Sequence, residues 1–254
     1  MREIRLVLLL LLLPWPLMAE EFRVNDDLTL RLEDGRTARL ADIELPRPLL
    51  NGKGPAKPAA ASLARKLLID LTAAKSISVS PAAEMDRWHH LPIQTEPSLQ
   101  IELLRRGLAR VMPETSDTPS LDRLFAAEAE ARTNHLGLWA DEAFSLRDPN
   151  EAGRWLDSLQ VFEGTVTSTN LARGFVYLNF GEDWKHGLSV KISRAYRKAL
   201  PGDPLSLSGR RLRVRGWLGK GMGPMIDIRH IRQLELLDGP WPAKLGTDPA
   251  KEAL

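Results

Sequence analysis

Short alternating segments near the start of this chain predict β-strands. Leu28, Leu30 and Leu32 alternate with polar residues, and the pattern stops at Asp34-Gly35 before a second run begins. Alternation places every second side chain on one face of a sheet, and Asp-Gly between two such runs favours a hairpin. The first part of the chain therefore starts as an antiparallel sheet.

The same kind of pattern returns from residue 159 onward, in five short runs separated by turn residues. One helical pattern, around Arg194 to Leu200, interrupts them. Five short strands with one helix predict a small, closed or nearly closed barrel of the OB type.

Helical patterns lie between the two strand regions. Apolar residues recur at the spacing of one helix face from residue 61 onward, again in residues 99–111, and again in residues 118–139. The third helix has Thr118 suited to its cap, Pro119 suited to its first turn and Gly137 suited to its end. The fold class is therefore mostly β with α, or α+β.

The beginning of the chain has the order of a secretory signal peptide. Arg2 and Arg5 precede an apolar run from Leu6 to Leu13, and Ala19 suits cleavage before Glu20. The run is too short to cross a bilayer, and no later segment is long and apolar enough, so no transmembrane segment is expected after cleavage. We therefore expect an exported protein, periplasmic or secreted. With no cysteine, the chain has no disulfide framework.

These patterns divide the chain into five predicted segments. A polar stretch separates the two strand regions, and the end of the chain is rich in proline and charge. The segments are a signal peptide at residues 1–19, a first domain at 22–145, a linker at 146–158, an OB-like domain at 159–237 and a disordered tail at 238–254.

Positive charge is concentrated in the second strand region. Residues 191–232 contain 11 Lys and Arg against 2 Asp and Glu, whereas residues 20–150 contain 17 against 21. Strand alternation places Arg211, Arg213, Arg215 and Trp217 on one face. Three guanidinium groups beside an indole favour binding of phosphates and a stacked base, and Lys191 extends this predicted surface for nucleic acid or another polyanion.

A structural interpretation of the same residues stays open. Trp217 is also suited to anchoring the barrel core or its contact with the first domain, and the arginines to pairing with the acidic N-terminal half.

Residues 22–142 resemble the staphylococcal nuclease (thermonuclease) family. The similarity lies in "DDLTLRLEDGRTARLADIELP", "EMDRWHHLPI", "ELLRRGLARV" and "FAAEAEARTNHLGLWADE". The resemblance implies an OB-type five-stranded barrel with three helices. It also implies phosphodiester hydrolysis, which needs a cation, a base and cationic groups that stabilise the phosphate.

Only part of the family's catalytic set is retained. The first arginine of the family's second motif falls on Arg39, and its aspartate falls on Glu44, which is one methylene longer. The calcium-binding aspartate of the first turn falls on Leu28, the glutamate that acts on water falls on Arg47, and the second phosphate-binding arginine falls on His90. Leucine offers no oxygen to calcium, and Arg47 accepts no proton. We therefore expect little or no nuclease activity by the family's mechanism.

Nearby acids leave a metal site open as an alternative. Asp26, Asp42 and Glu44, with Asp27 if the turn slips by one residue, are candidate ligands, and the competing interpretation is that they are surface turn residues. No cofactor is expected, or Ca²⁺ if the site is active.

Three functions follow. The first is an exported, catalytically degenerate protein that binds single-stranded nucleic acid, another polyanion or a protein partner in the cell envelope. The second is an active metal-dependent nuclease that uses Arg39 and the acids. The third is an interaction scaffold in which Arg47, His90 and the cleft that the family uses for catalysis bind a protein.

Overall fold

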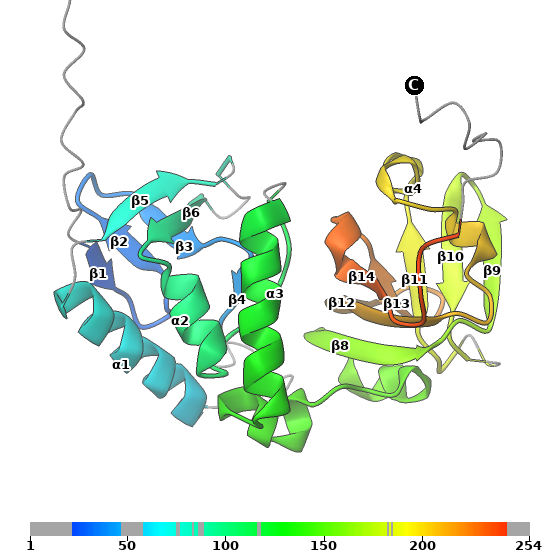
Figure 1. The fold of residues 1–254 in the computed structure, drawn as a ribbon, viewed down its shortest axis with the longest axis horizontal. Helices are drawn as coiled ribbons and strands as arrows, with labels where there is room; N and C mark the ends of the chain where they lie inside the picture. Colours follow the sequence, from blue (N-terminus) through cyan, green and yellow to red (C-terminus); the bar gives the residue numbers. More distant parts are fainter. Residues whose placement is uncertain are drawn as a thin grey trace, which may run out of the picture.

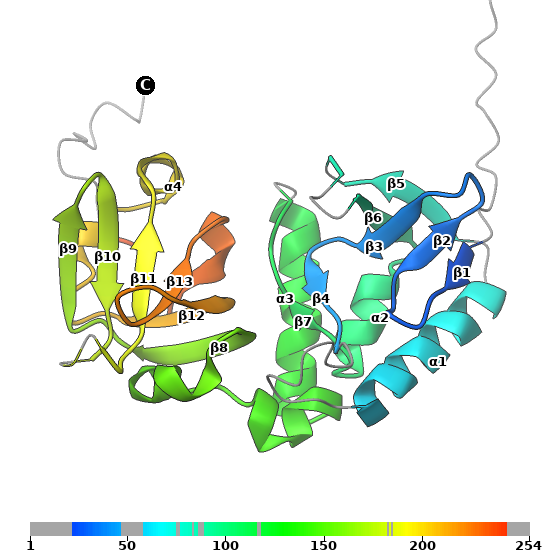
Figure 2. The ribbon, with the colours of Figure 1, turned by 180° about the vertical axis from the view of Figure 1, so that it is seen from behind.

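The computed structural model of the chain has two lobes joined by short helices (Figures 1 and 2). The N-terminal lobe carries the blue to green segments and the C-terminal lobe the yellow-green to red ones (Figure 1). Each lobe has its own hydrophobic core. The structure describes residues 22–46, 58–74, 77–82, 84–85, 89–115, 118–181, 183 and 185–242.

The N-terminal lobe is built on a five-stranded sheet that curls into a half-barrel. Its strand order is β1-β2-β3-β6-β5, with β3 and β6 parallel and the other pairs antiparallel. A separate pair, β4 and β7, lies beside helix α3 (Figure 2). The strands are β1 Phe22–Val24, β2 Leu30–Leu32, β3 Thr37–Leu40, β4 Ile43–Glu44, β5 Ser78–Pro81, β6 His90–Glu96 and β7 Arg110–Val111.

Three α-helices pack around this sheet, as the sequence predicts: α1 Pro58–Ala74, α2 Leu99–Arg105 and α3 Thr118–Thr133. In α1, Ala64 and Leu68 are fully buried in the core, which confirms the predicted apolar face. Ser98 caps α2 because its hydroxyl accepts a hydrogen bond from the Ile101 amide at 3.2 Å.

The third helix ends earlier than predicted. His135 takes the left-handed conformation (φ 52°) just after the helix, and the Leu136 and His135 amides donate to the carbonyls of Ala131 and Arg132. This is the Schellman arrangement that ends many helices. Gly137 has a different role, since a Cβ there would lie 2.5 Å from the Gly107 carbonyl oxygen. The glycine therefore permits a close contact between two backbones.

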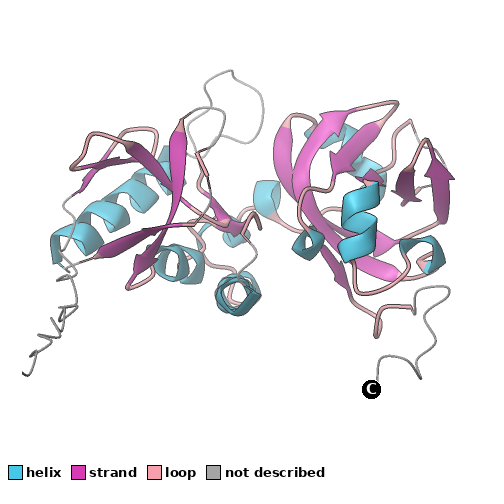
Figure 3. Ribbon diagram, turned by 90° about the horizontal axis from the view of Figure 1, so that it is seen from above, coloured by secondary structure: helices cyan, strands magenta, loops and turns pink. Residues whose placement is uncertain are grey.

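The C-terminal lobe is a seven-stranded sheet with one α-helix, α4 Arg194–Ala199 (Figure 3). Pairing runs from β8 through β12, β13, β11 and β10 to β9, and β14 adds to β12. Since β8 and β9 follow each other in the chain, this order brings the sheet back toward its beginning. The strands are β8 Ser158–Thr165, β9 Ser168–Ala172, β10 Phe175–Asn179, β11 Ser189–Ile192, β12 Arg211–Lys220, β13 Pro224–Asp227 and β14 Leu234–Leu236.

The sequence predicts five strands here, and the structure has more because two predicted strands are divided. The first is divided near Val166, whose amide donates to Arg210 and whose carbonyl accepts from Gly209. The last is divided by a short turn, in which Gln233 and His230 form a reciprocal capping box.

The predicted linker and tail both need correction. Residues 149–155, inside the predicted linker, form a 3-10 helix that buries Ala152 in the C-terminal core. At the other end, Asp238 accepts a hydrogen bond from the Arg210 guanidinium at 2.9 Å, and the Pro242 carbonyl accepts one from the Asp203 amide at 3.0 Å. Residues 238–242 are therefore held against the lobe by polar contacts that composition does not reveal. The rest of the predicted tail lies outside the described residues.

Five 3-10 helices complete the described structure: η1 Gly137–Ala140, η2 Glu142–Phe144, η3 Pro149–Trp155, η4 Pro204–Ser206 and η5 Ile231–Gln233. Within the described part of the chain, every helix is too short or too polar to cross a membrane.

Candidate functional site

Leu28 lies in the turn where the resemblance places a calcium-binding aspartate. The Leu28 amide donates to the Asn25 carbonyl at 3.1 Å, and Leu28 has a φ of 66°. This conformation costs a residue with a Cβ roughly 1–2 kcal/mol. The Leu28 side chain is 3% exposed in the core, and burial of a leucine contributes about 1.5–3 kcal/mol, which offsets that cost. The position is therefore a core position.

The two aspartates before Leu28 do not replace the missing ligand. The Asp27 carboxylate accepts hydrogen bonds from the Thr29 amide at 3.0 Å and the Thr29 hydroxyl at 2.6 Å, so it shapes the turn. Asp26 is almost fully exposed and lies 3.3 Å from the Arg65 guanidinium.

Arg39, where the resemblance places a phosphate-binding arginine, is held by a carboxylate from the same lobe. Its two terminal nitrogens donate to the two oxygens of Glu114 at 2.7 and 2.6 Å. This is the bidentate geometry in which a guanidinium binds carboxylate or phosphate. A phosphate would have to displace Glu114, a residue that the sequence analysis did not single out.

Asp42 is a structural residue. It is 1% exposed, and its carboxylate accepts from the amides of Glu114 and Thr115 at 2.8 Å each and from the Thr115 hydroxyl at 2.6 Å. A buried carboxylate with three donors is satisfied where it lies. Asp42 therefore ties the turn after β3 to the segment after β7.

Glu44 and His90, two other positions of the family's catalytic set, lie in different sheets. Glu44, in β4, is half-buried and pairs in register with Arg110 of β7. Burial lowers the pKa of Arg110 to about 10, and the charges of Glu128 and Glu44 oppose that shift. His90 begins β6 opposite Thr37, and Arg47 lies outside the described residues.

We call the part of the N-terminal lobe around Leu28, Arg39, Asp42 and Glu44 the nuclease-like corner. Calcium does not fit this corner. In the described ranges, no three His, Cys, Asp or Glu side chains gather as metal ligands. Calcium takes about 6–8 oxygen ligands, whereas here one family position is a buried leucine and the carboxylates of Asp27 and Asp42 are engaged by protein donors. The cluster of Asp26, Asp27, Asp42 and Glu44 that the sequence offered as an alternative is not formed.

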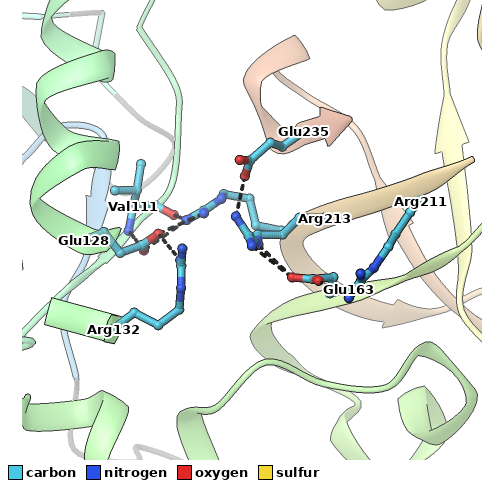
Figure 4. Close-up of polar contacts among 8 residues, drawn as sticks. Val111, Glu128, Arg132, Glu163, Arg211, Arg213 and Glu235 are labelled. Carbon is cyan, nitrogen blue, oxygen red and sulfur yellow. Dashed lines mark hydrogen bonds and ion pairs between the residues drawn. The ribbon is translucent and has the colours of Figure 1, made fainter. Parts of the chain in front are cut away.

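The arginines of β12 lie on one face, as alternation predicts, but they are paired with carboxylates (Figure 4). Arg211 lies 2.6 Å from Glu163, and Arg213 lies 2.9 Å from Glu163 and 2.8 Å from Glu235. Burial alone would lower the pKa of Arg213, yet the charges and hydrogen bonds of Glu235 and Glu163 raise it above its ordinary value. We call Arg211, Arg213 and Arg215 the arginine row.

Arg215 joins the two lobes. Its side chain is 3% exposed and lies 2.8 Å from Glu128 of α3, and it also donates to the Val111 carbonyl at 3.0 Å. Glu128 in turn accepts from the Val111 amide at 2.7 Å (Figure 4). The structural interpretation, in which the arginines pair with the acidic N-terminal half, is thus confirmed for Arg215. The sequence analysis missed Glu128, although it lies on the same helix face as Leu121 and Leu124, and a charge on an apolar face indicates a buried partner.

His230 brings the C-terminal lobe close to the corner. Burial lowers the pKa of His230, while Asp42 and the Thr115 backbone act in the opposite direction and Arg232 adds to the lowering. Its Nδ1 accepts from the Arg232 amide at 3.1 Å. His230 therefore lies near Asp42 and Thr115 of the N-terminal lobe.

Two other predicted binding residues lie on the outer side of the C-terminal sheet. Trp217 is 53% exposed, and the Lys191 ammonium lies 4.3 Å from the centre of the Phe175 ring and 3.4 Å from Asp227. That the arginine row, Lys191 and Trp217 bind nucleic acid stays a prediction.

A curled five-stranded half-barrel with three helices defines an α+β protein of the nuclease-like OB class. In agreement with that class, residues 37–141 match the family described as "Staphylococcal nuclease homologue", and this part of the chain is a domain of that family. The comparison with curated proteins found no match.

Proposed function

We propose that the chain is an exported nuclease-like protein that binds single-stranded nucleic acid and has lost cleavage by the calcium-dependent mechanism of its family. Two observations carry the loss of cleavage. Leu28 is buried where the metal ligand would stand, and Glu114 accepts hydrogen bonds from both terminal nitrogens of Arg39. Loss of one preorganised charge stabiliser costs roughly 100- to 1000-fold in rate, so the combined changes leave little activity.

The binding half of the proposal is supported by the family of residues 37–141 and by the positive charge of residues 191–232. Charge of one sign attracts polyanions irrespective of sequence. The OB-like assignment of residues 159–237 belongs to this proposal, and the strand order of the C-terminal lobe supports it.

Export rests on the sequence alone. Arg2, Arg5, the apolar run from Leu6 and the small residue Ala19 have the order of a cleaved signal peptide. We therefore place the protein in the periplasm or outside the cell.

A gel assay tests the proposal. The chain from Glu20 onward is incubated with labelled single-stranded DNA in calcium and in chelator, and binding is measured at low and high salt. We expect retarded, intact DNA in both, with retardation weakened by salt because counterions are released on binding.

Calcium-dependent cutting that disappears in Glu44→Ala, and persists in the control Asp70→Ala on the far helix α1, would establish an active nuclease instead. If the DNA is neither retarded nor cut, the remaining alternative is the protein-binding scaffold.

A further inference from the structure

The outer face of the C-terminal sheet combines aromatic rings with cations. Along β10, Val176 and Leu178 point into the core, so Phe175 and Tyr177 point outward. Lys191 lies on the same outer face of β11, directly opposite Tyr177. Both aromatic rings are half-buried. On β12, Arg213 and Arg215 line a different pocket, together with Phe125 and Glu128 of the N-terminal lobe.

Strand register aligns these residues across the sheet. Tyr177 pairs with Asn170 on one side and with Lys191 on the other, and Lys191 pairs with Asp227 of β13. The next strand, β12, places Trp217 beside Asp227, since Leu218 pairs with Ile226. Neighbouring strands lie about 4.8 Å apart, and three such spacings separate β10 from β12. The backbones of Tyr177 and Trp217 are therefore about 14 Å apart.

Trp217 lies at the edge of a shallow pocket of about 220 Å³. Met112 of the N-terminal lobe and Met225 of β13 line the pocket with it, and Lys220 and Arg229 complete its cationic side. Met222, in the loop after β12, is 85% exposed. An exposed indole and flexible methionine side chains give an apolar surface that suits a flat ring.

The cations near this face are available, in contrast to those of the arginine row. Arg173, Lys220 and Arg229 are exposed, and their side chains form no ion pair with any residue in the described part of the chain. Asp227 is the acidic side chain within the pocket lining, and Lys191 already faces it at 3.4 Å. The face therefore carries an excess of positive charge.

From this geometry we propose that Tyr177 and Trp217 stack two bases of one single strand, while Lys191, Arg173, Lys220 and Arg229 contact its phosphates. Rings separated along a cationic face are the combination that holds single strands without sequence preference. Bases supply flat faces and the backbone supplies charge, so a single strand uses both features of the face. This inference rests on the proposed binding of nucleic acid and specifies where it occurs.

Fluorescence anisotropy of a labelled oligothymidylate of about 12 nucleotides tests the site, since such barrels hold roughly 4–16 nucleotides. The chain from Glu20 onward serves as wild type. Trp217→Ala is expected to weaken binding roughly 5- to 150-fold, as loss of one stacked base does. Trp217→Phe retains a ring and is expected to restore most of the affinity. Tyr177→Ala should resemble Trp217→Ala, with its fold checked by circular dichroism.

Two controls separate this face from its rivals. Arg211→Ala removes an exposed cation of the arginine row, and it should weaken binding less than Trp217→Ala does. Leu63→Ala removes an exposed apolar side chain from α1 and should have no effect.

The outcomes are distinguishable. If the wild type binds and Trp217→Ala binds equally well, the inference is wrong and the proposed function stands. A loss caused by Arg211→Ala instead would move the site to the arginine row. A wild type that does not bind the oligonucleotide overturns both proposals.

Discussion

The outer face of strand β12 differs between the first half of the strand and its end. Its first half carries the arginine row, in which each guanidinium meets a carboxylate of the protein. Its end carries Trp217, which is 53% exposed beside the exposed cations Lys220 and Arg229. The nuclease-like corner follows the first pattern, since Arg39 is engaged by Glu114. Density of positive charge therefore does not identify the binding surface, because most of that charge stabilises the fold.

The difference has a physical origin in what covers each part of the strand. Arg215 faces α3 of the other lobe, and a charge buried by that contact requires a partner. Beyond Trp217 the N-terminal lobe contributes the apolar Met112 and no acid to the pocket lining. The same alternating sequence thus gives a structural ion pair at one position and an accessible ring two residues later.

Among the substitutions that test this comparison, Arg215→Ala should have the largest effect on stability. Removal of one partner leaves Glu128 buried without its cation, which typically costs about 3–5 kcal/mol. Urea unfolding followed by circular dichroism measures the change. Arg211→Ala is the matched control, since its exposed ion pair contributes about 0–1 kcal/mol. Equal effects of the two substitutions would mean that burial does not distinguish the members of the row. Arg215→Met combined with Glu128→Leu should recover part of the stability, because the Val111 amide still loses its acceptor.

Leu28→Asp tests whether the corner has lost only its ligand. The change restores the residue type of the family at this position, but it places a carboxylate in the core. We expect a loss of about 2–4 kcal/mol in unfolding free energy, within the range for core substitutions, and no calcium-dependent cleavage of DNA. Urea unfolding with and without calcium gives the measurement, and Asp26→Ala, at an exposed position of the same turn, is the control. Stabilisation of Leu28→Asp by calcium would show that the remaining ligands are still in place.

Sequence patterns predict most of the fold of this protein. Alternation identifies the strands and the apolar spacing identifies α1, because both depend on neighbours in the chain. The early end of α3 depends on His135 adopting a left-handed conformation, which no propensity indicates.

The site is less predictable, because it depends on contacts distant in sequence. Arg39 meets Glu114 across 75 positions, and Arg215 meets Glu128 across 87. The correspondence with the family gives the location of Arg39 but not its partner. Trp217 and Lys191 were found from the sequence as candidates, whereas their separation from the arginine row required the register of β10, β11, β12 and β13.

The smallest effect is expected for Glu114→Gln, which removes the charge that engages Arg39. The pair is partly exposed, with side-chain exposures of 22% and 27%, so its loss should change stability by about 0–1 kcal/mol. Glu114 lies two residues after Met112, which lines the pocket of Trp217. A single strand of nucleic acid that is bound at this pocket and extends into the corner would gain one phosphate contact from the freed Arg39.

The salt dependence of oligonucleotide binding measures that contact. One added contact to a single strand should steepen the slope of log K against log salt by about 0.7. Asp70→Asn, which removes a negative charge from α1, is the matched control and should leave the slope unchanged, because an exposed charge on a distant helix is screened. An unchanged slope in Glu114→Gln as well would place the corner off the path of the bound strand. Binding would then belong to the C-terminal face alone, and the nuclease-like corner would be a structural remnant.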